Sequence, residues 1–190
     1  MPSCDLDSKE VKDMAFPSRH TLRLAEYDYS TPGAYFITFC THGRRQTLSR
    51  IVGAIHESPE NRLTPYGRIL EGILGQMPEH LCVCVDRYVV MPNHVHLILV
   101  IHEETALRAI HESPLRSRSI ISKAVGYIKM NASKRIHERF GPTDVWQRGY
   151  YDHVIRNRAD YEAIAKYIEE NPLRWEIDRL FTKDEPDFNR

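Results

Sequence analysis

The sequence predicts an α+β fold in which helices pack on an antiparallel sheet. Segments rich in aromatic and β-branched residues alternate with segments of helical periodicity, in the order β, α, β, β, α, β, α. Two of the strand segments are separated only by Pro92 and Asn93, which predicts a tight hairpin and therefore antiparallel neighbours. The 190 residues are enough for one domain with a full core. We expect residues 21–180 to form this domain, with tails at 1–20 and 181–190.

The strand predictions rest on composition and on alternation along the chain. Residues 94–101 are apolar on both faces, because Val95 and Leu97 point to one side and Ile98 to the other. This strand should therefore be central in the sheet. The predicted strands are 34–42, 81–91, 94–101 and 151–156.

Three segments carry apolar residues at helical spacing and are bounded by capping or helix-breaking residues. Thr64 is a suitable N-cap for the first helix, with Pro65 at its first position and Pro78 as its stop. Gly141 ends the second helix and Pro172 closes the third. The predicted helices are 64–78, 119–140 and 158–172. The apolar stripe of the second helix comprises Ile120, Ile121, Val125, Ile128 and Ile136.

Composition and charge exclude several classes of protein. No apolar run reaches the roughly 18 residues of a membrane span, and the polar N-terminus lacks the apolar centre of a signal peptide, so we expect a cytoplasmic protein without a membrane partner. The four cysteines show no CxxC spacing, which argues against a zinc knuckle or a disulfide framework. The net charge is zero, but residues 105–139 hold eight Lys or Arg against two Glu. This segment is compatible with contact along a phosphate backbone and equally with a solvated helix face.

The hexapeptide AIHESP occurs twice, at 54–59 and at 109–114. The sequences on either side of the two copies are not similar to each other, and neither copy is part of a longer repeat unit. Both copies are therefore expected to be loops.

His94 and His96 are separated by one residue on the predicted central strand. Strand geometry places them side by side on one face, where two imidazoles can share a metal ion that needs a third protein ligand. Histidines buried in the core and satisfied by hydrogen bonds are the alternative, and the spacing alone leaves both open. Tyr167 and Asn171 lie one helical turn apart at the edge of the buried face of the last helix. Their spacing is also compatible with a surface tyrosine and a C-terminal cap.

Three blocks of sequence resemble one known family. Residues 91–100 read MPNHVHLILV and follow DRYVV, which resembles the histidine-hydrophobic-histidine motif of single-tyrosine HUH transposases. The similarity is greatest to the REP-associated tyrosine transposases, and it extends to LRLAEYDYSTPGAYFITFCTHGR near the start and VWQRGYYDHVIRNRADYEAIAKYIEENPLRW near the end. The resemblance covers about residues 20–176. It implies the ferredoxin-like, RRM-like sheet of HUH transposases.

The resemblance also implies a site and a reaction. His94 and His96 would bind a divalent metal, Mg²⁺ or Mn²⁺, with Asn171 as the third ligand, and Tyr167 would be the nucleophile. The reaction would be nicking and strand transfer of single-stranded DNA through a 5′-phosphotyrosine, in DNA transposition or in the processing of repetitive hairpin elements. A non-catalytic protein that binds hairpin DNA and a metal phosphodiesterase that uses water are the alternatives.

Other tyrosines and a set of basic residues complete the expectations. Tyr150, Tyr151 and Tyr161 are the rival candidates for the nucleophile. Tyr161 shares the apolar stripe of the last helix with Ile164 and Ile168, which favours a core role for it, while Tyr150 and Tyr151 lie beside the last strand and match a different block of the family. The basic residues expected to contact the DNA backbone are Arg44, Arg45, Lys123, Lys129, Lys134 and Arg135. The expected partner is single-stranded or hairpin DNA. A homodimer is left open, because related transposases work as dimers and members of this branch act as monomers.

Overall fold

A computed structural model describes residues 27–53, 59–103 and 119–183. Its centre is a four-stranded sheet with the order β4-β5-β1-β6, in which all neighbouring strands are antiparallel. The strands are β1 (Gly33–Cys40), β4 (Cys84–Val90), β5 (His94–Ile101) and β6 (Tyr151–Ile155). The inner position of β5 confirms the prediction for residues 94–101.

Two strands differ from their predicted bounds because the chain turns sharply next to them. β1 ends at Cys40, since Thr41 pairs with Trp146 in a single bridge and a 3₁₀ turn, η1 (His42–Arg44), follows. β4 begins at Cys84 rather than at residue 81, since a 3₁₀ turn, η2 (Glu79–Leu81), and a left-handed residue precede it.

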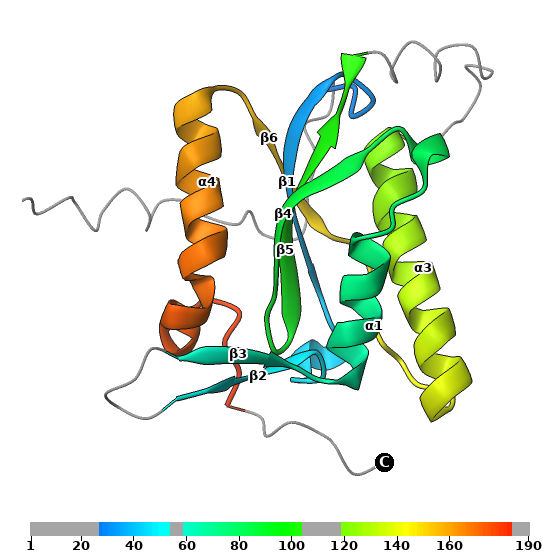
Figure 1. Ribbon diagram of the computed structural model, residues 1–190, viewed down its shortest axis with the longest axis vertical. Helices are drawn as coiled ribbons and strands as arrows, with labels where there is room; N and C mark the ends of the chain where they lie inside the picture. Colours follow the sequence, from blue (N-terminus) through cyan, green and yellow to red (C-terminus); the bar gives the residue numbers. More distant parts are fainter. Residues whose placement is uncertain (1–26, 54–58, 104–118, 184–190) are drawn as a thin grey trace, which may run out of the picture.

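Helices cover both faces of the sheet, with α4 on one face and α1 with α3 on the other (Figure 1). The helices are α1 (Pro65–Leu74), α3 (Ile120–Phe140) and α4 (Arg158–Glu170). Alternate residues of β5 pack into the cores on the two faces of the sheet. Val95 and Leu97 belong to the core under α1 and α3, and Ile98 packs with Ile164 and Ile168 of α4. The predicted fold class, an antiparallel sheet with helices packed on it, is confirmed.

α1 begins where the sequence predicts and ends earlier. Thr64 is its N-cap and accepts a hydrogen bond of 3.2 Å from the backbone N–H of Gly67. Gly67 is needed there because a Cβ atom would lie 2.1 Å from the carbonyl oxygen of Leu48. The helix ends at Leu74, not at Pro78, because Gly75 caps it and glycine is a poor helix former.

α3 confirms both its predicted bounds and its predicted buried face. All five residues of the predicted apolar stripe are buried. Ser119 caps the start of the helix, and Gly141 ends it with a φ of 86°, a conformation that glycine adopts without strain.

α4 ends at Glu170, and the chain continues into a 3₁₀ helix, η3 (Asn171–Ile177), instead of stopping at Pro172. Proline is tolerated in the first turn of a new helix, because its missing N–H would have no partner within that helix. This continuation brings the segment after Ile177 back toward the sheet, where it contributes to the candidate site.

A second, two-stranded sheet of β2 (Ser49–Val52) and β3 (Glu60–Leu63) was not predicted. Both strands are short, and ENRL shows no apolar alternation, so composition carries no strand signal there. Residues 54–58 of the first AIHESP copy and all of the second copy lie outside the described residues, so the loop prediction for them is not tested. Among the helices that the structure describes, none is both long and apolar enough to cross a bilayer.

Candidate active site

The two histidines of β5 are completely buried on the face of the sheet that α4 covers. The centroids of their rings lie 4.5 Å apart. The ring of Phe36, on the neighbouring strand, stacks on that of His96, and the ring centroids of Trp175 of η3 and His94 lie 5.9 Å apart. Apolar rings therefore wall the pair and exclude water from it.

Each histidine is held by a hydrogen bond at Nδ1. The carboxamide oxygen of Asn93 lies 2.8 Å from Nδ1 of His94, and the hydroxyl of Thr38 lies 2.7 Å from Nδ1 of His96. Asn93 also donates from its side-chain nitrogen to the carbonyl of Leu180 at 2.7 Å, which fixes which end of its amide faces His94. Since this oxygen can only accept, Nδ1 of His94 carries the proton and Nε2 presents a lone pair. Partners of this kind orient metal-binding histidines.

Burial keeps both rings neutral at physiological pH. It lowers the pKa of His94 to about 3, with a further contribution from the charge of Arg44. It also lowers the pKa of His96 well below its usual value, with the neighbouring His94 adding to the effect. Neutral imidazole is the form that binds metals.

Tyr167 and Asn171 bring their side chains to the same place. The phenol oxygen of Tyr167 lies 3.3 Å from Nε2 of His96. The side-chain oxygen of Asn171 is buried and has no hydrogen-bond partner among the described residues, and the same is true of Nε2 of His94. Buried polar atoms without a partner are costly, so these two mark a position where a ligand would be stabilised.

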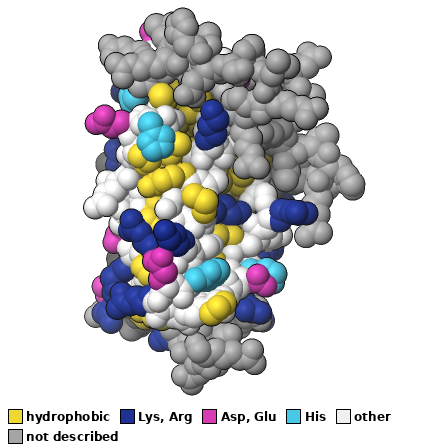
Figure 2. All heavy atoms as spheres, turned by 90° about the vertical axis from the view of Figure 1, so that its right-hand side faces the viewer, with side chains coloured by type: hydrophobic (Ala, Val, Ile, Leu, Met, Phe, Trp, Pro, Cys, Tyr) yellow, Lys and Arg dark blue, Asp and Glu magenta, His cyan; other side chains and the backbone are white. Residues whose placement is uncertain are grey.

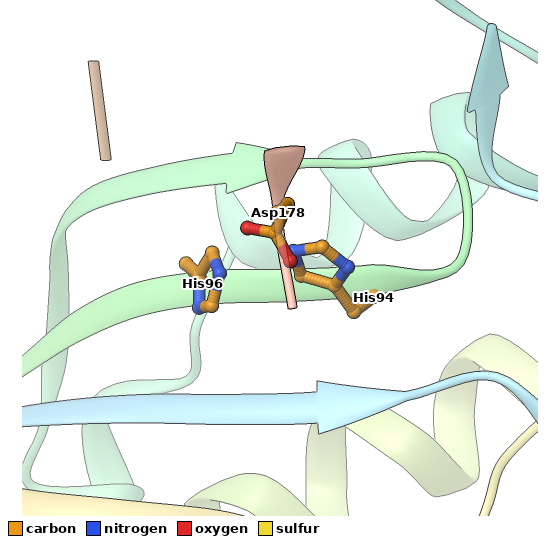
Figure 3. Close-up of side chains that lie close together, drawn as sticks. All are labelled: His94, His96 and Asp178. Atoms are coloured by element: carbon orange, nitrogen blue, oxygen red, sulfur yellow. The ribbon is translucent and has the colours of Figure 1, made fainter. Parts of the chain in front are cut away.

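Asp178, which the sequence analysis did not identify, completes the cluster (Figure 3). One ring nitrogen of each histidine and one carboxylate oxygen of Asp178 lie within 4.8 Å of one another. The Asp178 carboxylate accepts hydrogen bonds from the Tyr167 hydroxyl at 3.3 Å and from the Asn171 amide at 3.2 Å. The sequence did not predict a role for Asp178, because this residue follows a short 3₁₀ helix that hydrophobic periodicity does not reveal. Two imidazoles, an amide oxygen and a carboxylate form a donor set that fits a divalent cation such as Mn²⁺.

The Tyr167 phenol is protonated at neutral pH. Burial raises its pKa above the usual value of a tyrosine, and the negative charge of Asp178 raises it further. The hydroxyl is therefore a weak nucleophile unless a positive charge or a proton acceptor lies next to it.

The rival tyrosines lie elsewhere. Tyr161 donates a hydrogen bond to Asp86 of β4, and the hydroxyl of Tyr150 bonds Ser122 on the α3 side of the sheet. Tyr151 is opposite Thr38 in the sheet, and so it lies on the same face as the histidines but two strands away from His96.

The six basic residues predicted to contact DNA do not gather around the histidines. Arg44 in η1 is close enough for its charge to act on His94. Lys129 is partly buried and donates hydrogen bonds to the carbonyls of Gln147 and Gly149 at 2.6 and 2.9 Å. The other three on α3, which are Lys123, Lys134 and Arg135, are exposed on the opposite side of the sheet. Figure 2 shows this side, where Lys and Arg side chains concentrate over the lower half.

A buried histidine pair on the central strand of an antiparallel sheet, next to a tyrosine of the covering helix, is the arrangement that the resemblance to HUH transposases implied. A family model described as IS200-like transposase matches residues 33–171. The chain therefore belongs to the IS200-like transposase family, a family of DNA-processing enzymes.

Two relatives and one solved structure are also similar to this chain. An uncharacterized protein of Haemophilus influenzae is 30% identical over 172 residues, which span 86% of this chain and 93% of that protein. A second protein of this organism, provisionally named a REP-associated tyrosine transposase, is 22% identical over 147 residues, or 77% of this chain and 74% of the relative. The structure of a REP-associated tyrosine transposase bound to a REP hairpin superposes with a TM-score of 0.54 at 21% identity, covering 80% of this chain and 73% of that one. At this identity the superposition shows a shared fold.

Proposed function

We propose that this transposase nicks and rejoins single-stranded DNA through a covalent bond between Tyr167 and a 5′ phosphate. The observation that carries the proposal is the position of the Tyr167 hydroxyl, 3.3 Å from Nε2 of His96 and 3.3 Å from Oδ2 of Asp178. In the same part of the molecule, Nε2 of His94 and the side-chain oxygen of Asn171 are buried and have no hydrogen-bond partner among the described residues. A nucleophile and a set of metal-binding groups therefore converge on one point at the edge of α4.

His94, His96 and Asn171 would hold a divalent metal, with the Asp178 carboxylate as a further oxygen ligand or as the partner that orients Tyr167. When bound, such a metal would polarise the scissile phosphate and stabilise the charge that develops on it. Imidazole ligands together with oxygen ligands favour Mn²⁺ over Mg²⁺.

The reaction requires one bond to form at phosphorus and one to break. The phenol oxygen of Tyr167 attacks the phosphorus in line, the bond to the 3′ oxygen breaks, and the 3′ oxygen leaves and takes up a proton. Asp178 Oδ2 accepts the hydrogen bond of this phenol, which places it to receive the phenol proton. A second 3′ hydroxyl can attack the phosphotyrosine and rejoin the strands, because the energy of the broken bond is retained in the ester.

Single-stranded or hairpin DNA is the substrate that these features favour. The histidines and the phenol are recessed beneath Trp175 and η3, so a phosphate must be presented by a strand that is not held in a duplex. The solved transposase that shares this fold is bound to a REP hairpin. This supports a role in transposition or in the processing of repetitive hairpin elements.

The test is a covalent-adduct assay with a hairpin oligonucleotide that has single-stranded flanks, in the presence of Mn²⁺. We expect the wild-type protein to form an adduct that survives a denaturing gel, and Tyr167→Phe to form none. Tyr161→Phe is the matched control. It also removes a tyrosine hydroxyl from α4, but this hydroxyl forms a hydrogen bond with Asp86 and not with the histidine pair. Cleavage that persists in Tyr167→Phe would point to hydrolysis by water, and DNA that is bound but uncut by the wild type would point to a binding protein.

A further inference from the structure

A cavity lies at the end of the molecule where α1 begins and α3 ends, and neither histidine of the candidate active site lines it. It has a volume of about 240 Å³. Its walls include Tyr66 of α1 and Phe140 of α3, the η1 region with His42 and Arg45, and Asp144 in the loop after α3. We call it the α1–α3 pocket. The volume is below the roughly 300 Å³ of the smallest pockets that take drug-sized ligands, so it suits a single planar group.

Two aromatic rings line the α1–α3 pocket, and a positively charged side chain lies against one of them. The rings of Tyr66 and Phe140 lie with their centroids 5.0 Å apart. Phe140 keeps 40% of its surface exposed, although it is a large apolar residue. The guanidinium of Arg139 lies 5.4 Å from the centroid of the Phe140 ring. Aromatic rings next to cationic side chains are the surface on which unpaired nucleic-acid bases stack.

The lining of the pocket also includes groups that can form hydrogen bonds with the edge of a base. The carboxylate of Asp144 is 81% exposed and lies 4.0 Å from Nε2 of His42. A carboxylate accepts hydrogen bonds from the amino groups of bases, as in the contacts of Asp and Glu with cytosine. The side chain of Arg45 at the rim is exposed and can contact a phosphate.

The α1–α3 pocket is joined to the candidate active site by a short stretch of backbone. Cys40 is paired with His94 in the sheet, and the next residue, Thr41, lines the pocket. Thr41 donates two hydrogen bonds to the carbonyl of Asn93, the residue whose side chain orients His94. Arg44 lies in the η1 turn that connects the two places. A DNA strand with a phosphate at the histidines would therefore reach the pocket by passing along η1.

We propose that the α1–α3 pocket binds one unpaired base of the DNA strand that is cut at the candidate active site. The base stacks on Phe140, its edge faces Asp144, and Arg44 and Arg45 contact the phosphates between the pocket and the histidines. This inference rests on the proposed function and extends it, because a base held at a fixed distance from the histidines determines which phosphate is presented to Tyr167.

The test is an abasic scan of the hairpin oligonucleotide, with the base removed at one position at a time through the loop and both flanks. Binding is measured by fluorescence anisotropy with Tyr167→Phe protein in EDTA, so neither cleavage nor metal affects the readout. We expect one position at which base removal weakens binding about tenfold, the size of a lost stacking contact. The position of the effect shows whether the base comes from the loop or from a flank.

The scan is repeated with Phe140→Leu, which keeps an apolar residue at the end of α3, and with Tyr88→Leu as the control. Tyr88 is exposed to 38%, close to the 40% of Phe140, and lies on β4 outside the pocket. We expect the tenfold effect to disappear in Phe140→Leu and to persist in Tyr88→Leu. A scan without any sensitive position, or an effect that persists in Phe140→Leu, overturns the pocket assignment. Adduct formation by the wild-type protein, measured separately, then shows whether the proposed function stands without it.

Discussion

The hydroxyl of Tyr167 lies 3.3 Å from Nε2 of His96, although the two residues are 71 positions apart in the chain. Nε2 is also the atom through which His96 would bind a metal, because its Nδ1 is bonded to Thr38. A metal at this nitrogen must replace the hydrogen bond to the phenol. The proposed nucleophile and the proposed metal would therefore meet at one atom, and the predictions below follow from this contact.

Tyr167→Phe should bind Mn²⁺ at least as tightly as the wild-type protein. The substitution removes the hydroxyl that competes for Nε2 of His96 and leaves the other donors of the cluster in place. Isothermal titration of both proteins with Mn²⁺ measures the difference. Weaker binding by Tyr167→Phe would show that the phenol is itself a ligand.

His94→Ala should remove metal binding and leave the fold intact. In the wild type, Mn²⁺ at about a hundred times its dissociation constant should stabilise the folded state by about 2.7 kcal/mol, which raises the melting temperature by about 5–10 °C. His94→Ala should lose this rise, while His137→Ala, on the other side of the sheet, should keep it. Differential scanning calorimetry with and without EDTA measures the shift. A full rise in His94→Ala would refute the assignment of His94 as a ligand.

Asn93→Ala should weaken Mn²⁺ binding about 10–100-fold, the usual cost of removing a group that orients a metal-binding histidine. The side-chain oxygen of Asn93 accepts a hydrogen bond from Nδ1 of His94, and its side-chain nitrogen donates one to the carbonyl of Leu180. Asn93→Asp keeps an acceptor toward His94 and should recover part of the affinity in the same titration. Equal losses in the two variants would mean that the bond to Leu180, and not the orientation of His94, is what matters.

Acid should destabilise the metal-free protein through its buried histidines. The folded-state pKa of His94 is about 3, below its value of about 6.5 in the unfolded chain, so its contribution to stability is present above pH 6.5 and is lost as the pH falls toward 3. The free energy of unfolding should drop by about 1.4 kcal/mol per pH unit in this window for each such histidine. Urea unfolding in EDTA at pH 7.5 and 5.5 should show a loss that is about 1.4 kcal/mol smaller in His94→Gln than in the wild type. An equal loss in both proteins would contradict the lowered pKa.

Two glycines of α1 should respond oppositely to alanine. A Cβ at Gly67 would lie 2.1 Å from the carbonyl oxygen of Leu48, so Gly67→Ala must displace backbone and should cost more than about 2 kcal/mol. A Cβ at Gly72 meets nothing within 4 Å, and Gly72→Ala should stabilise the protein by up to about 1 kcal/mol through helix propensity. Urea unfolding compares the two variants. Similar values for both would mean that α1 does not pack against Leu48 as described.

Local periodicity was sufficient for much of the fold and for part of the site. The period of two along a strand placed His94 and His96 on one face, and the spacing of four along a helix placed Tyr167 beside Asn171. Both rules depend on backbone geometry within a few residues, so they hold wherever the element packs. The resemblance to HUH transposases joined the two pairs into one expected site, which the geometry supports.

The sequence by itself thus determined the strands of the main sheet, the three helices and their core faces, and the family resemblance added the four residues of the expected site. Only the tertiary structure decided which groups surround them, because contacts between distant segments depend on how helices pack on the two faces of the sheet. It placed Lys123, Lys134 and Arg135 across the sheet from the histidines, and it engaged Lys129 with two backbone carbonyls. It also returned the chain after η3 to the site, where Asp178 joins the cluster and Leu180 holds Asn93. No local pattern encodes these contacts, since each depends on a chain reversal whose direction is set by packing.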